Sequence, residues 1–355
     1  MESNQLIPIK NVYYMLSYAF QVLNEAGYKK LATEEFENIG DLCAAILIKG
    51  ISSQIKRGLV REYIPETEAL SSLKGRINIS DSIKSNSIIK NQMVCTYDEF
   101  SLNSYVNRII KTTVEILLKS DISKNRKKEL RKLIIIFSEV EVLDPYRINW
   151  KIQYNRNNQT YQMLISICYL VIKGLLLSSS SGGTKLMDFF DEQRMCHLYE
   201  KFILEYYRKE HPEIKADALQ IPWALADDDS TDMLPIMQTD ITLKSKSGDR
   251  VLVIDAKYYS HNTQSQFGKN TIHSGNLYQV FTYVKNLEAL NTDNTQEIAG
   301  MLLYAKTVDQ VQPDSTFHMS GNTISVKNLD LNQDFADISN ALDQIANSYF
   351  AKEAV

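Results

Sequence analysis

The first half of the chain combines apolar stripes of helical spacing with one segment of shorter, strand-like pieces. Residues 11–23 carry apolar side chains at i, i+3, i+4 and i+7, and helical patterns return over residues 41–57 and 104–117. This spacing predicts helices. Residues 61–79 have short β-like runs separated by turns. The most apolar stretch, residues 163–177, is interrupted by a lysine and a glycine and is short for a membrane span, so we expect a buried helix.

The second half has the pattern of a sheet flanked by helices. Residues 192–210 form one strong helical stripe, and residues 276–286 form another helical pattern. Between them, residues 239–244 alternate polar and apolar positions, and residues 250–259 contain a buried strand core. The turn residues 245–249 make these runs a hairpin-like pair. We therefore predict an α/β protein, with a mixed α+β N-terminal domain and a C-terminal mixed sheet flanked by helices.

A Ser/Gly run at residues 178–183 is the best candidate for a linker, because such runs do not pack into a core. It divides the 355 residues near their middle, and this length suits two domains. We place the domains at residues 1–180 and 181–355.

Composition removes several function classes. With 39 Lys and Arg against 43 Asp and Glu, the formal net charge of −4 argues against a protein that coats nucleic acid by bulk charge. DNA contact must then come from a local basic surface or from a partner. No CxxC, HExxH, GxxxxGK[ST] or GxSxG motif occurs, so zinc, P-loop and serine-hydrolase chemistry are not indicated. We expect a cytoplasmic protein with reduced thiols and no membrane segment.

A basic run covers residues 119–132, with seven basic residues and two acids. Charge runs of this kind are usually a solvated helix face. The alternative interpretation is a surface that contacts phosphate groups or an acidic partner.

The candidate chemistry is carried by three charged residues of the hairpin-like pair. Asp255 and Lys257 lie two apart at the end of the buried run and so share one face of the strand. Burying them is costly unless they are paired or bind an ion. Asp240, on the neighbouring strand, brings a second carboxylate to the same place. Two carboxylates suit Mg²⁺, and a lysine beside them can position water or offset charge on phosphate oxygens, as in the D…(D/E)xK nucleases.

Three other residues are weaker candidates for the same site. Gln279 and Tyr283 lie at i, i+4 on one face of a predicted helix, where they either position DNA and buttress the lysine or simply belong to a core helix. Glu200 lies at the border of the apolar stripe in residues 192–210. It is either a third acid of the site or a solvated surface glutamate.

Six segments spread along the chain are shared with one known family. They are residues 7–16 (IPIKNVYYML), 73–77 (LKGRI), 107–111 (NRIIK), 237–241 (MQTDI), 253–259 (VIDAKYY) and 276–279 (NLYQ). On this combination the chain resembles the McrC family, the nuclease subunits of McrBC modification-dependent restriction systems. The resemblance runs over nearly the whole chain, whereas a D…DxK core alone would fit many nucleases.

The resemblance implies a PD-(D/E)xK endonuclease domain in residues 181–355, with Asp240 and Asp255 as Mg²⁺ ligands and Lys257 as the catalytic lysine. Thr239 stands where the family often has a proline, which we expect to matter little because the carboxylate touches the metal. The resemblance also implies that the N-terminal half docks on a McrB-like hexameric AAA+ ring, which binds GTP and recognises 5-methylcytosine or another modified cytosine in double-stranded DNA. The basic run and the loop at Arg76 are candidate contacts with this ring. The implied activity is that of a type IV restriction endonuclease subunit in antiphage defence, which also stimulates the GTPase of its partner.

Two other functions stay open at this point. One is a non-catalytic regulatory subunit of an AAA+ motor that keeps the nuclease fold as a scaffold, although an intact Asp/Asp/Lys set argues against it. The other is a stand-alone RecB-like repair nuclease of the Gln-x3-Tyr type, against which the long N-terminal half counts.

Overall fold

The chain divides into two compact units in the computed structural model. The sheet unit comprises Met1–Ala32 and Phe190–Val355, and the helical unit comprises Thr33–Phe189. The structure describes residues 7–20, 23, 28, 31, 34–154, 159–180, 192–226, 230–266, 269–291 and 295–350. Within these ranges no helix is both long and apolar enough to cross a membrane.

Four longer helices among the described residues of the helical unit pack on one another. They are α2 (Ile39–Arg57), α4 (Tyr105–Lys119), α5 (Lys124–Ile134) and α6 (Gln162–Ser180). Asn38, Ser104 and Ser123 begin the first three, because each side chain accepts a hydrogen bond from a backbone N–H of the first turn. The predicted helices are thus confirmed. The predicted linker begins with three residues that still belong to α6, and its remainder, residues 181–183, lies outside the described residues.

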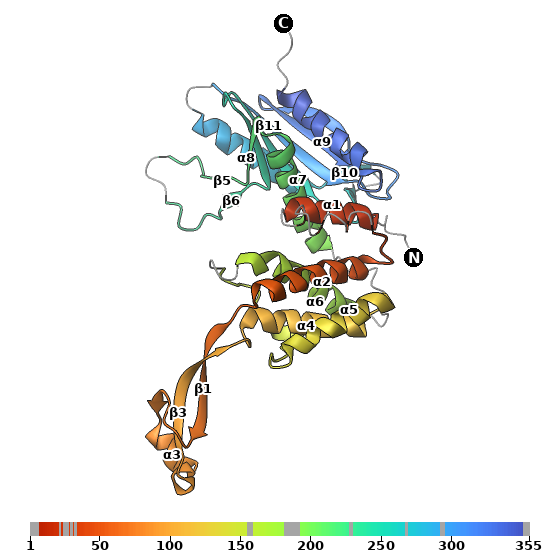
Figure 1. The fold of residues 1–355 in the computed structure, drawn as a ribbon. Helices are drawn as coiled ribbons and strands as arrows, with labels where there is room; N and C mark the ends of the chain where they lie inside the picture. Colours follow the sequence, from red (N-terminus) through yellow and green to blue (C-terminus); the bar gives the residue numbers. More distant parts are fainter. Residues whose placement is uncertain are drawn as a thin grey trace. The chain divides into compact units, whose positions relative to one another are not determined.

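A long antiparallel arm belongs to the helical unit and accounts for the strand-like pattern of residues 61–79. Figure 1 shows its two long strands running away from the helices of that unit and carrying a short helix at their far end. Its elements are β1 (Glu62–Leu70), β2 (Arg76–Ile77), α3 (Ile79–Lys84), the 3-10 turn Ser87–Lys90 and β3 (Met93–Ser101). The order is β1-β3-β2, with Glu62 opposite Ser101 and Leu70 opposite Met93. We call residues 62–101 the arm and residues 71–92 its tip.

Gly75 explains why the LKGRI segment needs a glycine. Its φ of +68° lies in the left-handed region, and a Cβ atom there would clash with the carbonyl oxygen of Thr96. Only glycine meets both demands.

The sheet unit contains a six-stranded mixed sheet. The strand order is β12-β13-β11-β8-β7-β4, with β8 parallel to β11 and antiparallel to β7. The strands are β4 (Ile214–Asp217), β7 (Ile241–Ser245), β8 (Arg250–Lys257), β11 (Glu297–Ala305), β12 (Ser315–Met319) and β13 (Asn322–Leu329). Two small ribbons, β5 (Gln220–Ile221) with β6 (Met237–Gln238) and β9 (Thr263–Gln266) with β10 (Lys269–Ile272), complete the strands of the described residues. The predicted α/β class and the predicted strand pair are confirmed.

Helices cover both faces of this sheet (Figure 1). They are α7 (Glu192–Glu210), α8 (Ser274–Leu290) and α9 (Phe335–Phe350), and α1 (Ile9–Ala19) packs on α7. On one face α8 packs its Val280, Tyr283 and Val284 against β8, β11 and β13. On the other, α7 and α9 lie together, since the hydroxyl group of Tyr207 in α7 donates to the carbonyl oxygen of Leu342 in α9. This double cover explains why β8 is buried over nearly its full length.

Helix α1 packs with the C-terminal half, and residues 1–32 belong to the same compact unit, whereas the predicted division at residue 180 groups them with the N-terminal domain. The reason is the apolar and polar contact of α1 with α7 and with the segment before α9. Tyr18 donates a hydrogen bond to Glu210 at 2.8 Å, and the Asn11 amide donates to the carbonyl oxygen of Leu331 at 2.9 Å. Tyr14 stacks on Phe335. The two helical patterns at residues 11–23 and 41–57 therefore belong to different units.

Candidate active site

Asp255 and Lys257 lie at the end of β8, on the face of the sheet that α8 covers. Alternation along the strand places them on the same side as Val251 and Val253, which belong to the α8 core. The Asp255 side chain is 1% exposed, and its Oδ2 lies 2.8 Å from Nζ of Lys257. A buried acid and its lysine are thus held together where the strand leaves the core, as the sequence pattern predicts.

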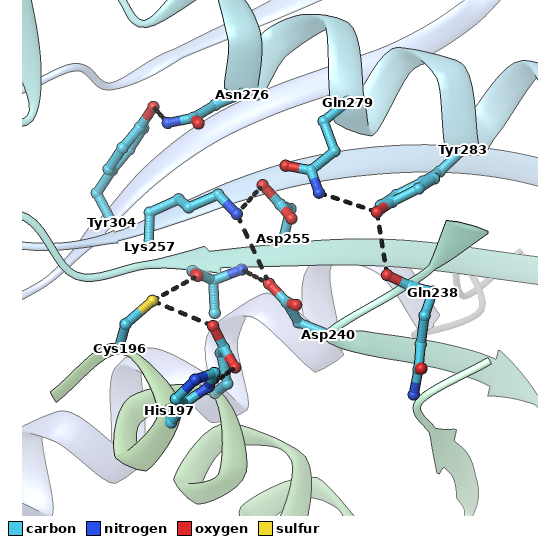
Figure 2. Close-up of polar contacts among 12 residues, drawn as sticks. Cys196, His197, Gln238, Asp240, Asp255, Lys257, Asn276, Gln279, Tyr283 and Tyr304 are labelled. Carbon is cyan, nitrogen blue, oxygen red and sulfur yellow. Dashed lines mark hydrogen bonds and ion pairs between the residues drawn. The ribbon is translucent and has the colours of Figure 1, made fainter. Parts of the chain in front are cut away.

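Asp240 reaches the same point from the residue that precedes β7. The antiparallel register pairs Ile241 with Ile254, which brings the start of β7 beside the end of β8. Oδ2 of Asp240 accepts a hydrogen bond from the backbone N–H of Ala256 at 3.0 Å and lies 4.0 Å from Nζ of Lys257. Figure 2 shows the two carboxylates on either side of the lysine ammonium group. The three residues that the sequence singled out are therefore adjacent.

Electrostatics at this cluster favour a shared cation or proton. Burial, followed by the charge of Asp255, raises the pKa of Asp240 to about 8. Burial also raises the pKa of Asp255, although Lys257 opposes this shift. For Lys257, burial acts to lower the pKa, but the charges of Asp255 and Asp240 outweigh it and hold the pKa above its usual range. The lysine therefore stays charged at neutral pH, while the two acids resist being ionised together.

Thr239 fixes the backbone that presents Asp240. It is 2% exposed, its N–H donates to the carbonyl oxygen of Leu219 at 2.9 Å, and its hydroxyl oxygen accepts from the N–H of Leu219 at 3.0 Å. Its hydroxyl group also lies 2.9 Å from that of Thr242. A proline at this position would lack both the N–H and the hydroxyl group, so it could not make these hydrogen bonds. Sequence reasoning did not assign it this role.

Helix α8 brings Gln279 and Tyr283 to the cluster from above the sheet (Figure 2). Nε2 of Gln279 donates to the Tyr283 hydroxyl oxygen at 2.9 Å, and that hydroxyl group donates to the carbonyl oxygen of Gln238 at 3.0 Å. Tyr283 is buried, whereas Gln279 is exposed. Asn276, one turn earlier on the same face, donates to the hydroxyl oxygen of Tyr304 at 3.0 Å. Asn276 lies three residues before Gln279 in the sequence. This helical spacing predicts that the two share a face, and the sequence analysis did not single out Asn276.

Helix α7 contributes Glu200 from the other side of Asp240. Glu200 is half-buried and accepts a hydrogen bond from Sγ of Cys196 at 3.1 Å, and its second oxygen lies 3.2 Å from Nδ1 of His197. Burial, and then Glu200, raises the pKa of Cys196 to about 12, so this thiol remains a donor. A cavity of about 450 Å³ is lined by His197, Glu200, Lys201, Leu204, Glu205, Ala218, Gln238, Thr239 and Asp240. Glu200 and Asp240 thus line the same cavity. His197 lines it too, although the sequence analysis did not predict this.

The donor set suits a hard divalent cation held by few protein ligands. Among the described residues, only Lys257 and the carboxyl group of Asp240 interact with the two buried oxygens of Asp255. Within the described ranges, no group of three or more His, Cys, Asp or Glu side chains forms a complete metal cage. Mg²⁺ does not need one, since it commonly keeps several waters and binds through one or two carboxylates plus phosphate oxygens.

Comparisons with known proteins add to this geometry. A family model described as "McrBC 5-methylcytosine restriction system component" matches residues 4–305. The chain is 31% identical over 304 residues to the type IV methyl-directed restriction enzyme EcoKMcrBC of Escherichia coli strain K12, covering 84% of this chain and 86% of that protein. Among solved structures, a refined half-complex of Thermococcus gammatolerans McrB AAA+ hexamers with bound McrC gives a TM-score of 0.48 at 18% identity, covering 96% of this chain and 77% of that chain. The cryo-EM structure of the McrBC complex from the same organism gives 0.38 at 18% identity, covering 57% and 59%.

Proposed function

The chain belongs to the family of McrBC 5-methylcytosine restriction system components, and on that premise we propose that it is the DNA-cleaving subunit of such a system. The proposed reaction is Mg²⁺-dependent hydrolysis of phosphodiester bonds in double-stranded DNA that carries modified cytosine. The observation that carries the proposal is the cluster of Asp240, Asp255 and Lys257, with its lysine 2.8 Å and 4.0 Å from the two carboxylates.

Asp240 and Asp255 would hold the metal ion. When bound, Mg²⁺ would lower the pKa of a coordinated water and offset charge on the phosphate oxygens. The raised pKa values of both acids mark a pair whose negative charges lack sufficient compensation in the protein alone. The N–H of Ala256 keeps one oxygen of Asp240 in place. These features support a cation-binding role over a simple salt bridge, which would need only one acid.

Lys257 acts through its charge. Because its pKa is raised above the usual range, the ammonium group does not lose its proton at neutral pH and is a poor general base. A fixed cation at this position can orient the attacking water and stabilise the negative charge that develops on the scissile phosphate. Glu200, which α7 contributes to the adjoining cavity that Asp240 also lines, would be a third acid of the site.

Tyr283 is proposed as a positioning residue. Its hydroxyl group holds the carbonyl oxygen of Gln238, two residues before Asp240, and accepts from Gln279. We expect Tyr283→Phe to lower kcat for cleavage by about tenfold, as for other contacts that orient a metal ligand, with KM for DNA little changed. Tyr278→Phe, on the same helix but 67% exposed, is the matched control. An equal loss in both variants would refute the positioning role.

The proposed partner is a hexameric AAA+ GTPase that binds GTP and reads the modified base. The tip of the arm has the chemistry of a docking surface, since apolar side chains lie exposed at its end. They include Leu73 at 61%, Ile79 at 62%, Ile83 at 60% and Ile89 at 82%. Exposed apolar residues grouped in this way mark protein contact sites. Arg76 lies among them, so the sequence candidate at this loop is retained.

We expect Ile83→Asp with Ile89→Asp to weaken association with the AAA+ ring by about a hundredfold or more, because buried charges at an apolar contact carry a large cost. Both side chains are exposed in the free chain, so its melting temperature is expected to stay unchanged. Ile135→Asp with Ile136→Asp, at 70% and 43% exposure outside the arm, is the matched control. Size-exclusion chromatography of the mixed proteins measures the difference, and normal association of the arm variant would contradict the assignment.

Reconstitution tests the function as a whole. The chain is mixed with the AAA+ partner, GTP, Mg²⁺ and either methylated or unmethylated DNA. The proposal predicts cutting of methylated DNA only when all components are present, together with faster GTP hydrolysis by the partner. Cutting by the chain with Mg²⁺ alone would favour a stand-alone repair nuclease, and GTPase stimulation without any cutting would favour a non-catalytic regulator.

A further inference from the structure

We propose that the outward face of α5 is a phosphate-binding surface that contacts the backbone of double-stranded DNA. The proposal rests on the proposed function in that DNA is the substrate. It goes beyond that function because it assigns DNA contact to the helical unit, whereas the candidate active site belongs to the sheet unit.

Five cations share one side of the helix. With 100° per residue, they fall within an arc of about 140°. They are Lys124, Lys127, Lys128, Arg131 and Lys132. Four of them are exposed, and Lys127 is half-buried. We call these five residues the α5 stripe.

The opposite side of α5 makes its packing contacts and ion pairs within the helical unit. Leu130 is fully buried where α5 packs on α2 and α4. Arg126, which points away from the stripe, forms ion pairs with Glu34 and Glu129. No ion pair joins a residue of the α5 stripe to any acid among the described residues. Among the described residues, the cation of α5 that forms ion pairs is therefore separate from the five cations that form none.

Helix stability does not account for the α5 stripe. Lys124 and Lys127 lie in the first turn, where the helix dipole disfavours positive charge, and that turn contains no acid. Stripe residues also face one another at i, i+3 and i+4, and each like-charge pair of this kind costs about 0.2–0.5 kcal/mol. Only Arg131 and Lys132, in the last turn, are favoured by the dipole. The arrangement costs the free chain stability, and binding to an anion would recover it.

The chemistry of the α5 stripe fits phosphate better than protein. Lysine is depleted from protein–protein interfaces, whose contact energy comes from buried aromatic and apolar anchors. The arm tip has such exposed apolar side chains, whereas four of the five stripe residues are lysines. Residues 124–132 span about 12 Å at 1.5 Å per residue, which matches about three or four phosphates of one strand. Such contacts are independent of sequence, as a nuclease handed different DNA sequences requires.

The test measures binding of the full chain to a labelled, unmodified 30-base-pair duplex in EDTA, over a range of KCl concentrations. We expect Arg131→Glu with Lys132→Glu to weaken binding at least tenfold near 0.1 M salt. The slope of log Kd against log salt should fall by about 2, since each lost phosphate contact removes about 0.9 from it. Lys124→Gln with Lys128→Gln, which adds no negative charge, should also lower the slope, by about 1–2.

Lys56→Glu with Arg57→Glu is the matched control. This adjacent pair also lies in the last turn of a helix of the helical unit, α2, and is exposed, so net charge and helix position change equally. We expect this control variant to change the Kd for the duplex by less than twofold. Equal weakening in both glutamate variants, no weakening in the stripe variants, or no salt-dependent binding by the unmodified chain would overturn the proposal. Loss of association with the AAA+ ring while DNA binding persists would also overturn it, in favour of an acidic protein surface.

Asp255→Ala is the separate check of the proposed function. This variant should lose cleavage and keep DNA binding, so failure of the proposed function can be distinguished from failure of the α5 proposal.

Discussion

Asp255→Ala is expected to reduce DNA cleavage by the reconstituted complex at least about a thousandfold, because it removes one of two carboxylates that would hold the metal and leaves Lys257 without its ion-pair partner at 2.8 Å. Stimulation of the partner's GTPase is expected to persist, since the arm belongs to the other unit. The measurement is the single-turnover rate of cutting methylated DNA, alongside the rate of GTP hydrolysis.

Asp249→Ala is the matched control for that experiment. Asp249 lies in the turn between β7 and β8, on the same hairpin, and its carboxylate accepts hydrogen bonds from Ser245 and Ser247 rather than facing the cluster. We expect it to cut DNA at nearly the normal rate. Undiminished cleavage by Asp255→Ala, with GTPase stimulation intact, would remove Asp255 from the proposed site.

Asp240→Asn is expected to have two opposite effects: loss of cleavage by at least about a hundredfold and a gain in stability of the metal-free chain. The gain follows from the sign of the pKa shift. Because the folded protein raises the pKa of Asp240 from 3.8 to about 8, this carboxyl group favours folding most below pH 4, and its contribution declines as the pH rises to about 8. Asparagine has nearly the same shape as the Asp240 side chain and carries no charge.

The stability gain should therefore be absent near pH 4 and grow towards pH 8, where we expect about 1–3 kcal/mol from removing a buried uncompensated charge. Denaturant unfolding in EDTA at several pH values measures it. Added Mg²⁺ should narrow the difference, because the ion binds only the native aspartate form. Asp249→Asn is the control of opposite sign: hydrogen bonds from Ser245 and Ser247 lower the pKa of this exposed aspartate to about 2. A gain in both variants, or in neither, would contradict the account of Asp240.

The local elements of this protein follow closely from its sequence. The helix predicted over residues 192–210 agrees with α7 (Glu192–Glu210), because a long apolar stripe ends at a His-Pro pair. The β7–β8 pair could also be predicted, since a buried run and an alternating run flank a short turn. The same pattern placed Asp255 and Lys257 on one face, which needs only the two-residue period of a strand.

Other parts depended on contacts that no local pattern encodes. The apolar run of β11 was not recognised as the strand that lies between β8 and β13, because a short apolar run has no periodicity to distinguish strand from helix. The membership of α1 in the sheet unit rests on side-chain contacts across more than 190 residues, such as Tyr18 with Glu210. The alternation of β7 suggested one polar face, yet Thr242 is buried and bonded to Thr239.

The sequence alone singled out two aspartates and one lysine, placed by strand periodicity, as the candidates for the chemistry, in a chain whose net charge of −4 says little about DNA. What surrounds them depends on the tertiary structure: burial and the charge of Asp255 raise the pKa of Asp240, whereas the charges of Asp255 and Asp240 raise the pKa of Lys257 against the effect of burial. Within the basic run, the tertiary structure also separates Arg126, which forms ion pairs in the helical unit, from the α5 stripe, which has no ion pair with any acid that the structure describes. Strand and helix periods are local properties, whereas burial and pairing depend on segments that only folding brings together.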